Sequence, residues 1–234
     1  MKKSILITGA SQGIGLATAY SLESAGWNVI GVARRVPAGF PGQFIECDLS
    51  SEENLSDLVT TIKKRSDILG IVNNLGMARH ESFANVDYAD FQSLLQFNLR
   101  PALVLSQAVL SNMKSANFGR IINIGSLVSQ GYPFRTSYAA AKSALVSLTK
   151  TIAIEYAANG ITANVIAPGP TETELFRQNN PAGSDAENRY LSKIPMQRLA
   201  KPEEIASAVA FFASVSAQFI TGQTLFIDGG ASLN

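Results

Sequence analysis

The sequence is short of cysteine and of charge. Its 234 residues include one cysteine, Cys47, so no disulfide can form within the chain. Only 16% of the residues are charged, and 19 lysines and arginines against 18 aspartates and glutamates leave a net charge of +1. Binding to a phosphate backbone needs a basic surplus, so we expect no nucleic-acid partner.

Long hydrophobic runs and flexible linkers are also missing. The opening residues Met1–Ile7 resemble the start of a signal peptide, but the apolar run breaks at Thr8-Gly9, too early for a secretory segment. No stretch of ~18 apolar residues is available to span a bilayer. No Gly-, Pro- or Ser-rich linker and no repeat divides the chain. We therefore expect one cytoplasmic domain that has no membrane partner.

Metal ligands are equally sparse. No spacing of His, Cys, Asp and Glu along the chain resembles a metal site, so we expect no metal cofactor. The one histidine, His80, is expected in an exposed loop. Cys47 is expected to be a small apolar residue at the end of a strand.

The sequence is instead 46% hydrophobic, and short apolar runs alternate along it with longer amphipathic or Ala-rich segments. The predicted strands are Ser4–Thr8, Asn28–Ala33, Gln43–Glu46, Gly70–Asn73, Gly119–Gly125, Thr162–Ala167 and Gln223–Asp228. The predicted helices are Gly13–Ala25, Ser51–Lys64, Tyr88–Met113, Thr136–Asn159 and Lys201–Ala213. Internal strands that are continuously apolar are typical of a parallel sheet covered on both faces. The pattern predicts a single-domain α/β fold, a Rossmann-type doubly wound parallel sheet of about seven strands with helices on both faces.

One segment, residues 171–200, does not follow this alternation. It carries Asn179-Asn180-Pro181, Gly183 and few periodic apolar positions. An irregular stretch of this length inside a domain is usually functional. Because it directly follows a predicted strand, we expect a substrate lid, with an ordinary surface excursion as the alternative.

A glycine-rich turn follows the first predicted strand and leads into a helix. Glycines permit a tight bend and let backbone N–H groups approach a pyrophosphate, whose charge is favoured at a helix N-terminus. Glycines can also end a strand for packing reasons alone, but a strand before and a helix after favour the cofactor interpretation. The predicted cofactor-binding residues of this turn are Gly9, Ser11, Gln12, Gly13, Ile14 and Gly15.

Several motifs follow this turn in a fixed order over essentially the whole chain. They are Asp48-Leu49, Asn73-Asn74-Leu75-Gly76, Asn98, Ser126, Tyr138-x-x-x-Lys142, Pro168-Gly169 and Ile220-Thr221-Gly222 through Asp228-Gly229-Gly230. Together with the spacing Thr8-Gly9-x-x-x-Gly13-x-Gly15, they resemble the short-chain dehydrogenase/reductase family. Within it, the pattern is most similar to the 3-oxoacyl-[acyl-carrier-protein] reductase-like branch. One departure is Leu75, where the family usually has alanine and where the added bulk would lie beside the cofactor.

The candidate catalytic residues are Asn98, Ser126, Tyr138 and Lys142. Tyr138 and Lys142 are four residues apart on a predicted helix, so they share one face. A phenol with a pKa of about 10 needs a neighbouring cation to exchange protons near neutral pH. The resemblance implies that Ser126 hydrogen-bonds the substrate oxygen, Tyr138 protonates it and Lys142 also holds the nicotinamide ribose. It implies that Asn98 holds a water of the proton relay; the alternative is a buried asparagine satisfied by backbone.

The resemblance also implies a second set of cofactor contacts. They are Asp48, Leu49, Asn74, Gly76, Tyr138, Lys142, Pro168, Gly169, Thr171 and Thr173. Asp48 would contact the adenine, and Thr171 and Thr173 would orient the nicotinamide carboxamide. The alternatives are a residue near a helix N-cap for Asp48 and an ordinary polar turn after Pro168-Gly169.

The end of the second strand distinguishes the two nicotinamide cofactors. A carboxylate there accepts from the ribose of NAD, whereas NADP needs a cation for its 2′-phosphate. This chain has Ala33 followed by Arg34 and Arg35. Both arginines could be solvated strand-end charges, but the missing carboxylate favours NADP(H), with NAD(H) as the less favoured alternative.

The resemblance thus implies an NADP(H)-dependent oxidoreductase that reduces a 3-oxoacyl thioester or a small ketone. Alternatives are an alcohol or sugar dehydrogenase in the oxidative direction and an NADP(H)-binding regulatory protein. Positions where the reductase branch carries basic docking residues are neutral here, Asn117 and Asn159, so an acidic small substrate contacting Arg79, Arg135 or Arg177 is a further hypothesis. The long predicted helices 88–113 and 136–159 imply a homotetramer or homodimer.

Overall fold

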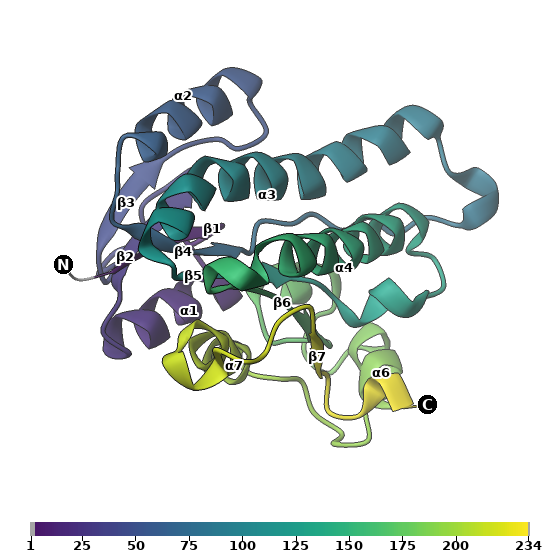
Figure 1. Ribbon diagram of the computed structural model, residues 1–234. Coiled ribbons are helices and arrows are strands. Elements are labelled where there is room, and N and C mark those ends of the chain that lie inside the picture. Colours follow the sequence, from purple (N-terminus) through teal and green to yellow (C-terminus); the bar gives the residue numbers. More distant parts are fainter. Residues whose placement is uncertain (1–2, 234) are drawn as a thin grey trace.

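The computed structural model describes residues 3–233 and is built on a seven-stranded parallel sheet of order β3-β2-β1-β4-β5-β6-β7 (Figure 1). The strands are β1 (Ser4–Thr8), β2 (Asn28–Ala33), β3 (Gln43–Glu46), β4 (Ile68–Asn73), β5 (Gly119–Ile124), β6 (Ile161–Pro168) and β7 (Thr224–Ile227). The strand order runs outward in both directions from the pair β1 and β4. Such a switch point leaves a crevice at the carboxyl ends of the strands, where ligands bind in open α/β sheets.

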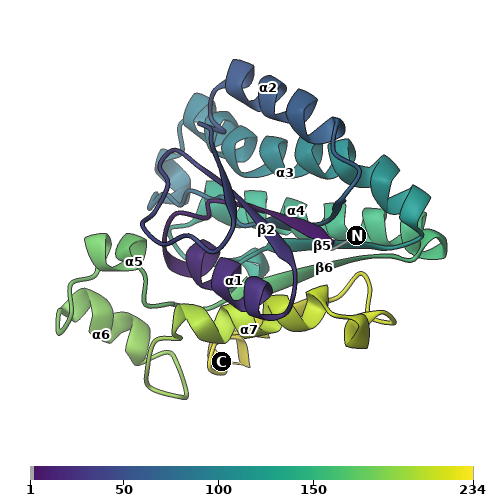
Figure 2. The same ribbon diagram turned by 90° about the vertical axis from the view of Figure 1, so that its left-hand side faces the viewer.

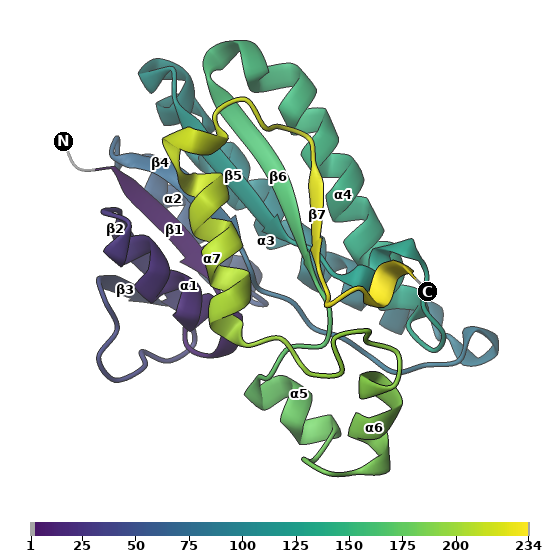
Figure 3. The same cartoon turned by 90° about the horizontal axis from the view of Figure 1, so that it is seen from below.

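Helices cover both faces of this sheet. The helices are α1 (Gly13–Ser24), α2 (Glu52–Lys63), α3 (Tyr88–Ala116), α4 (Thr136–Tyr156), α5 (Glu174–Asn179), α6 (Asp185–Leu191) and α7 (Pro202–Ala213). Helices α2, α3 and α4 lie on one face, and α1 and α7 lie together on the other (Figures 1 and 2). The short helices α5 and α6 lie beyond the carboxyl ends of the strands, next to the crevice (Figure 3).

The central strands are apolar throughout because each of their two faces meets a layer of helices. In β1 every residue is buried: Leu6 packs into the core beneath α2 and α3, and Ile5 and Ile7 pack into the core beneath α1 and α7. The edge strands β3 and β7 have no fully buried residue. Within the described residues 3–233, no helix is long and apolar enough to cross a membrane.

The predicted fold class and all seven predicted strands are confirmed, with small shifts at the ends. Strand β4 begins at Ile68 instead of Gly70, and α3 continues to Ala116, where Asn117 ends it in a left-handed conformation with φ of 46°. Helix α4 ends at Tyr156 and is followed by a 3-10 turn. The segment 171–200 contains α5 and α6, which the sequence did not predict because they are too short to show a period.

A chain of buried polar side chains ties the sheet to two helices. Asn73 in β4 lies opposite Asn123 in β5, and its Nδ2 donates to Asn123 Oδ1 at 2.8 Å. Asn123 Nδ2 in turn donates to Thr149 Oγ1 in α4 at 2.7 Å, and Asn73 Nδ2 also donates to Ser106 Oγ in α3 at 3.1 Å. These bonds fix α3 and α4 on the central strands. The residues near the N-terminus of α4 are thereby held in place as well.

We expect Asn123→Leu to lower the free energy of unfolding by about 1–3 kcal/mol, because Asn73 and Thr149 each lose one buried hydrogen bond. Thr149→Val should also destabilise the fold, through the same bond. The double variant should then lose less than the two single losses added together. Urea unfolding followed by circular dichroism measures all three values, and strictly additive losses would show that the two side chains act independently.

Candidate active site

A cavity of about 1790 Å³ opens at the carboxyl ends of the strands. All the predicted cofactor-binding and catalytic residues line it except Gly15 and Asn98, which lie directly behind its wall. The lining comes from the ends of six strands, from the segment before α4 and from α5 and α6. The fold therefore brings together side chains that are distant in sequence.

The glycine turn between β1 and α1 forms one wall. Gly9 and Gly13 have φ of 65° and 52°, a region that glycine enters without steric cost. Gly15 must lack a side chain because a Cβ there would lie 2.2 Å from the Gly9 carbonyl oxygen. The N-cap residue Gln12 makes no side-chain bond to the helix, and the first turn of α1 holds no acidic residue. The first N–H groups of α1 are thus available to an anion.

The end of β4 holds this turn in place. Thr8 Oγ1 accepts from the backbone N–H groups of Asn74 and Leu75, each at 3.0 Å. Asn74 Nδ2 donates to the carbonyl oxygens of Thr8 and Gly9 at 3.0 and 3.1 Å. The side-chain nitrogen of Asn74 therefore holds the glycine turn, and Asn74 also lines the cavity.

The ends of β2 and β3 form one end of the cavity. Arg34 and Arg35 are exposed, and neither forms an ion pair within residues 3–233. Asp48 Oδ1 accepts from the amide and hydroxyl of Ser50 at 3.0 and 2.6 Å. These bonds, followed by the charge of Arg34, hold the pKa of Asp48 below its usual value.

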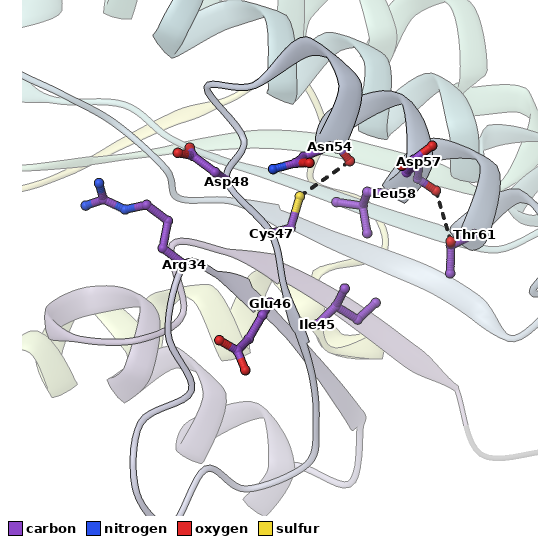
Figure 4. A pocket seen from close by; sticks show the side chains of 9 residues that line it. All are labelled: Arg34, Ile45, Glu46, Cys47, Asp48, Asn54, Asp57, Leu58 and Thr61. Atoms are coloured by element: carbon purple, nitrogen blue, oxygen red, sulfur yellow. Dashed lines mark hydrogen bonds between the residues drawn. The ribbon is translucent and has the colours of Figure 1, made fainter.

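A smaller hollow of about 530 Å³ adjoins this end of the cavity (Figure 4). Arg34 and Asp48 border it, and Cys47 lies between β3 and α2 with Sγ 3.5 Å from the Asn54 carbonyl oxygen. Burial, followed by the charges of Asp48 and Asp57, raises the pKa of the Cys47 thiol. Cys47 is therefore the small buried residue at a strand end that the sequence predicted.

Ser126 and Tyr138 meet at the centre of the cavity. Ser126 follows β5 and its Oγ accepts from the Val128 amide at 3.3 Å; its hydroxyl also lies near the phenol of Tyr138 on α4 and favours the ionised form of that phenol. Burial raises the pKa of Tyr138, while the Ser126 hydroxyl and the charge of Arg135 oppose this rise. The phenol is therefore protonated at neutral pH and can act as a proton donor.

Lys142 lies one turn further along α4 and is almost completely buried. Its Nζ donates to the Ile124 carbonyl oxygen at 2.8 Å and lies 5.6 Å from the centre of the Tyr138 ring. Burial lowers the pKa of Lys142 to about 8. The expected ammonium beside the phenol is therefore present, but its hydrogen bond points to the end of β5.

Gly76 and Asn98 pack against Lys142. A Cβ at Gly76 would lie 3.1 Å from both Lys142 Nζ and Asn98 Oδ1, so a side chain there would have to displace these two polar atoms. Asn98 Nδ2 donates to the Met77 and Leu94 carbonyl oxygens at 3.0 and 2.9 Å, and its Oδ1 accepts from the Met77 amide at 3.2 Å. Asn98 is thus satisfied by backbone, an arrangement that is compatible with both of its predicted roles.

The end of β6 completes the cofactor wall. Gly169, which follows Pro168, packs so closely on Asp228 that a Cβ would lie 2.7 Å from the Asp228 Cα. Thr171 Oγ1 donates to the Gly169 carbonyl oxygen at 2.9 Å. Thr173 caps α5 by accepting from the Phe176 amide at 3.2 Å, so its hydroxyl already has a structural role.

Sequence reasoning missed several residues in the other half of the cavity. They are contributed by the loop before α4, by α6 and the residues after it, and by the C-terminus: Tyr132, Phe134, Arg189, Tyr190, Lys193, Ala231 and Ser232. Only the irregular composition of residues 171–200 hinted at such a set. His80 is exposed, as expected, but it also lines the cavity and stacks on Phe134 at 5.2 Å between ring centres.

The three arginines that could contact an acidic substrate lie in different surroundings. Arg79 forms an ion pair with Asp90, and Arg177 forms ion pairs with Glu172 and Glu187. Neither lines the cavity, whereas Arg135 does. Asn117 and Asn159 precede β5 and β6, at the opposite end of the sheet. Within residues 3–233, no group of three or more His, Cys, Asp and Glu side chains is arranged to hold a metal ion.

The low pKa of Lys142 can be measured directly. In the cofactor-free protein we expect its Cε resonance to titrate near pH 8 instead of the usual 10.5, because burial penalises the ammonium. A lysine with a lowered folded-state pKa binds fewer protons in the folded than in the unfolded state between those two pH values. Relative to Lys142→Met, folding stability should therefore rise between pH 8 and 10.5. NMR of ¹³C-labelled lysine, with Lys142→Met to assign the signal, makes the test, and a midpoint at 10.5 would contradict it.

Known proteins share this arrangement along the whole chain. Residues 9–232 match a family model described as enoyl-(acyl carrier protein) reductase. The 3-oxoacyl-[acyl-carrier-protein] reductase FabG of Haemophilus influenzae is 39% identical over 99% of this chain and 99% of its own length.

Solved structures agree with this similarity. A short-chain dehydrogenase/reductase family protein superimposes with a TM-score of 0.87 at 34% identity, covering 99% of this chain and 98% of its own. A protein proposed to be an NAD(P)-dependent gluconate 5-dehydrogenase from Beutenbergia cavernae, solved with bound NADP at low occupancy, superimposes with a TM-score of 0.91 at 30% identity. The match covers 99% of this chain and 97% of that one. The glycine turn, the Ser126–Tyr138 pair and these similarities lead to one conclusion: the chain belongs to the short-chain dehydrogenase/reductase family of oxidoreductases.

Proposed function

We propose that this protein reduces a carbonyl group to an alcohol with NADPH, using Tyr138 as the proton donor. The observation that carries the proposal is that Ser126 and Tyr138 lie together in the same cavity as the glycine turn. A cofactor-binding regulator needs the turn but not the pair. An enzyme needs both in one cavity, as they are found here.

The cavity fits a dinucleotide phosphate on structural grounds. The glycine turn leaves no room for a side chain at Gly15, and the N-terminus of α1 is uncapped, so a pyrophosphate would lie there. Arg34 and Arg35 are the cations available to a 2′-phosphate at the end of β2, where Ala33 leaves no carboxylate to oppose it. The neighbour solved with bound NADP supports the same cofactor.

In this proposal Ser126 and Tyr138 hold the carbonyl oxygen of the substrate by two hydrogen bonds. NADPH supplies the hydride that forms the new C–H bond. The phenol of Tyr138 gives its proton to the oxygen, so the carbonyl becomes an alcohol and NADPH becomes NADP⁺. The charges of Arg135 and Lys142 stabilise the resulting phenolate, which regains a proton from solvent.

The substrate proposal starts from the two kinds of relative. The similarity to FabG favours a 3-oxoacyl thioester or a small ketone, and the similarity to the gluconate dehydrogenase neighbour favours a sugar-acid alcohol oxidised in the reverse direction. The same residues serve both directions, since the acid of one direction is the base of the other. We place reduction first because FabG, which is 39% identical to this chain, is named a reductase.

Three further expectations stay predictions: a cytoplasmic location, a lid and an oligomer. We propose that α5, α6 and the rest of residues 171–200 form a lid over the substrate, since they line the cavity from beyond the strand ends. We also propose a homodimer or homotetramer, in which copies pair through α3 and α4. Leu103 on α3 and Ile154 on α4 are exposed apolar side chains that such pairing would bury.

The first test follows NADPH consumption with a 3-oxoacyl thioester of N-acetylcysteamine. We expect turnover with the native protein and a loss of at least about a hundredfold in kcat for Tyr138→Phe, because the proton donor is gone. NADPH binding, measured by fluorescence, should be kept in the variant. Binding without turnover of any thioester, ketone or sugar by the native protein would contradict the proposed function.

The second test concerns the choice of cofactor. Removing the cation with Arg34→Ala should raise the KM for NADPH by on the order of tenfold or more, since a charge-assisted bond to phosphate is lost. The KM for NADH should stay nearly constant. Adding a carboxylate with Ala33→Asp in the same variant should favour NADH. An equal rise in both KM values would instead indicate a general disturbance of the site.

A further inference from the structure

The lining of the cavity is more basic than the chain as a whole. Six lysines and arginines line it, against only two carboxylates, Asp48 and Glu174. In the full sequence, positive and negative residues nearly balance at 19 and 18. The excess of positive charge is therefore concentrated at the site.

Both carboxylates lie on the cofactor side. Asp48 is held by Ser50 beside Arg34, and Glu174 lies over the glycine turn, where a Cβ at Gly13 would come 3.8 Å from its Oε2. Three cations line the opposite side, which is formed by the loop before α4 and by α6 with the residues after it: Arg135, Arg189 and Lys193. Within the described part of the chain, no carboxylate lines that side.

Arg135 lies close to the proposed proton donor Tyr138 in the sequence and acts on its pKa. It lies three residues before Tyr138, and its charge lowers the pKa of that phenol. One guanidinium nitrogen donates to the Tyr190 hydroxyl of α6 at 3.0 Å, and the guanidinium makes no other hydrogen bond or ion pair within residues 3–233. Glu81 is paired with Arg135 in an isolated β-bridge, but its carboxylate accepts from the Ser137 amide at 2.7 Å. Most of the donors of Arg135 are therefore available to a ligand.

Arg189 projects from α6 and has no ion pair within the described residues. The contrast with Arg177 in the same segment is clear: Arg177 bonds to Glu172, Glu187 and the Asn180 carbonyl oxygen, so its charge is already balanced. The charge of Arg177, which supports the segment, is thus balanced by carboxylates. The charge of Arg189, which faces the cavity, is not balanced by an ion pair within the described residues.

The backbone before Arg135 is fixed in an uncommon conformation. Phe134 has φ of 58°, a left-handed value that bulky side chains rarely adopt. The Glu81 amide donates to the Phe134 carbonyl oxygen at 3.1 Å, and the His80 ring stacks on the Phe134 ring. A strained turn held from two sides is typical of a position where the chain fixes a functional group.

We infer that the substrate is an oxo acid, whose carboxylate binds Arg135 and Arg189 while its ketone oxygen lies against Ser126 and Tyr138. This inference rests on the proposed reductase function and names its substrate class. A planar guanidinium matches a carboxylate with two parallel hydrogen bonds, so the pair selects for the charge and also orients the ketone. Apolar residues of the same cavity, among them Phe97 and Leu127, would contact the carbon chain between the two groups.

The test compares oxo acids with their own methyl esters. We would measure kcat/KM with NADPH for 3-oxobutanoate, 4-oxopentanoate and 5-oxohexanoate and for the three esters, because the series varies the distance between ketone and charge. For the best acid we expect kcat/KM on the order of 10- to 100-fold above its ester. Arg135→Gln should remove most of this ratio, and Arg189→Gln should reduce it.

Two controls separate charge from structure. Tyr190→Phe removes the bond from α6 to Arg135 but keeps the guanidinium, so the ratio of acid to ester should persist. Arg100→Gln removes a cation that is paired with Glu52 outside the cavity, and it should leave all rates unchanged. Arg135→Lys should restore part of the ratio.

The possible failures are distinguishable. If esters and the N-acetylcysteamine thioester are reduced as fast as the acids, or if Arg135→Gln leaves the ratio intact, the oxo-acid inference is wrong and the reductase function stands. If a phosphopantetheine thioester exceeds every oxo acid, the cations serve a phosphate instead and the inference is also wrong. If no compound is reduced although NADPH binds, the proposed function itself fails.

Discussion

The contact between the carboxyl ends of β1 and β4 is the constraint on which the site depends. Four hydrogen bonds join the two strand ends at this point. Two of them link Thr8 and Asn74, one links Asn74 to Gly9, and one links Leu75 to Thr8. Because the strand order changes direction between these two strands, no crossover helix fills the space above them. The glycine turn is therefore held open toward the crevice, and every other part of the cavity is arranged around it.

The cavity has two halves of different construction. The cofactor half consists of strand ends and the turns that directly follow them, whose backbone is fixed by the sheet. The opposite half consists of the loop before α4, the short helix α6 with the residues after it, and the C-terminal residues Ala231 and Ser232. Rigid strand ends suit a ligand that every relative shares, and separate loops suit one that differs between relatives.

The sequence predicted the fold well because its signals are local, and the strand-end residues that it assigned to one site line one cavity. Strand β1 and the glycine turn are contiguous, and burial on both faces makes the central strands apolar throughout. Strand ends at β4 and helix ends at α3 and α4 shifted because caps such as the left-handed Asn117 depend on tertiary contacts. Two candidate site residues lie behind the cavity wall. The Gly9 carbonyl oxygen occupies the place of a side chain at Gly15, and the Asn98 amide is bonded to the backbone of Met77 and Leu94.

The opposite half could not be predicted in the same way. Arg135, Arg177 and Arg189 look alike in sequence, and only the positions of their carboxylate neighbours separate them. Glu172 and Glu187 are five and ten residues from Arg177, at separations that have meaning only after α5 and α6 have formed. Two side chains that meet across such short helices leave no periodic signal.

The ion pairs of Arg177 also bear on how this protein can change over time. They lie within residues 171–200, joining Glu172, α5 and α6, so this segment keeps its shape by its own contacts. The exposed residues of α6, Arg189 among them, carry none of that internal structure. They are free to vary by mutation while the glycine turn and the Ser126–Tyr138 pair are preserved. A descendant of this chain can thus acquire a new substrate through a few replacements on one short helix and inherit its chemistry unaltered.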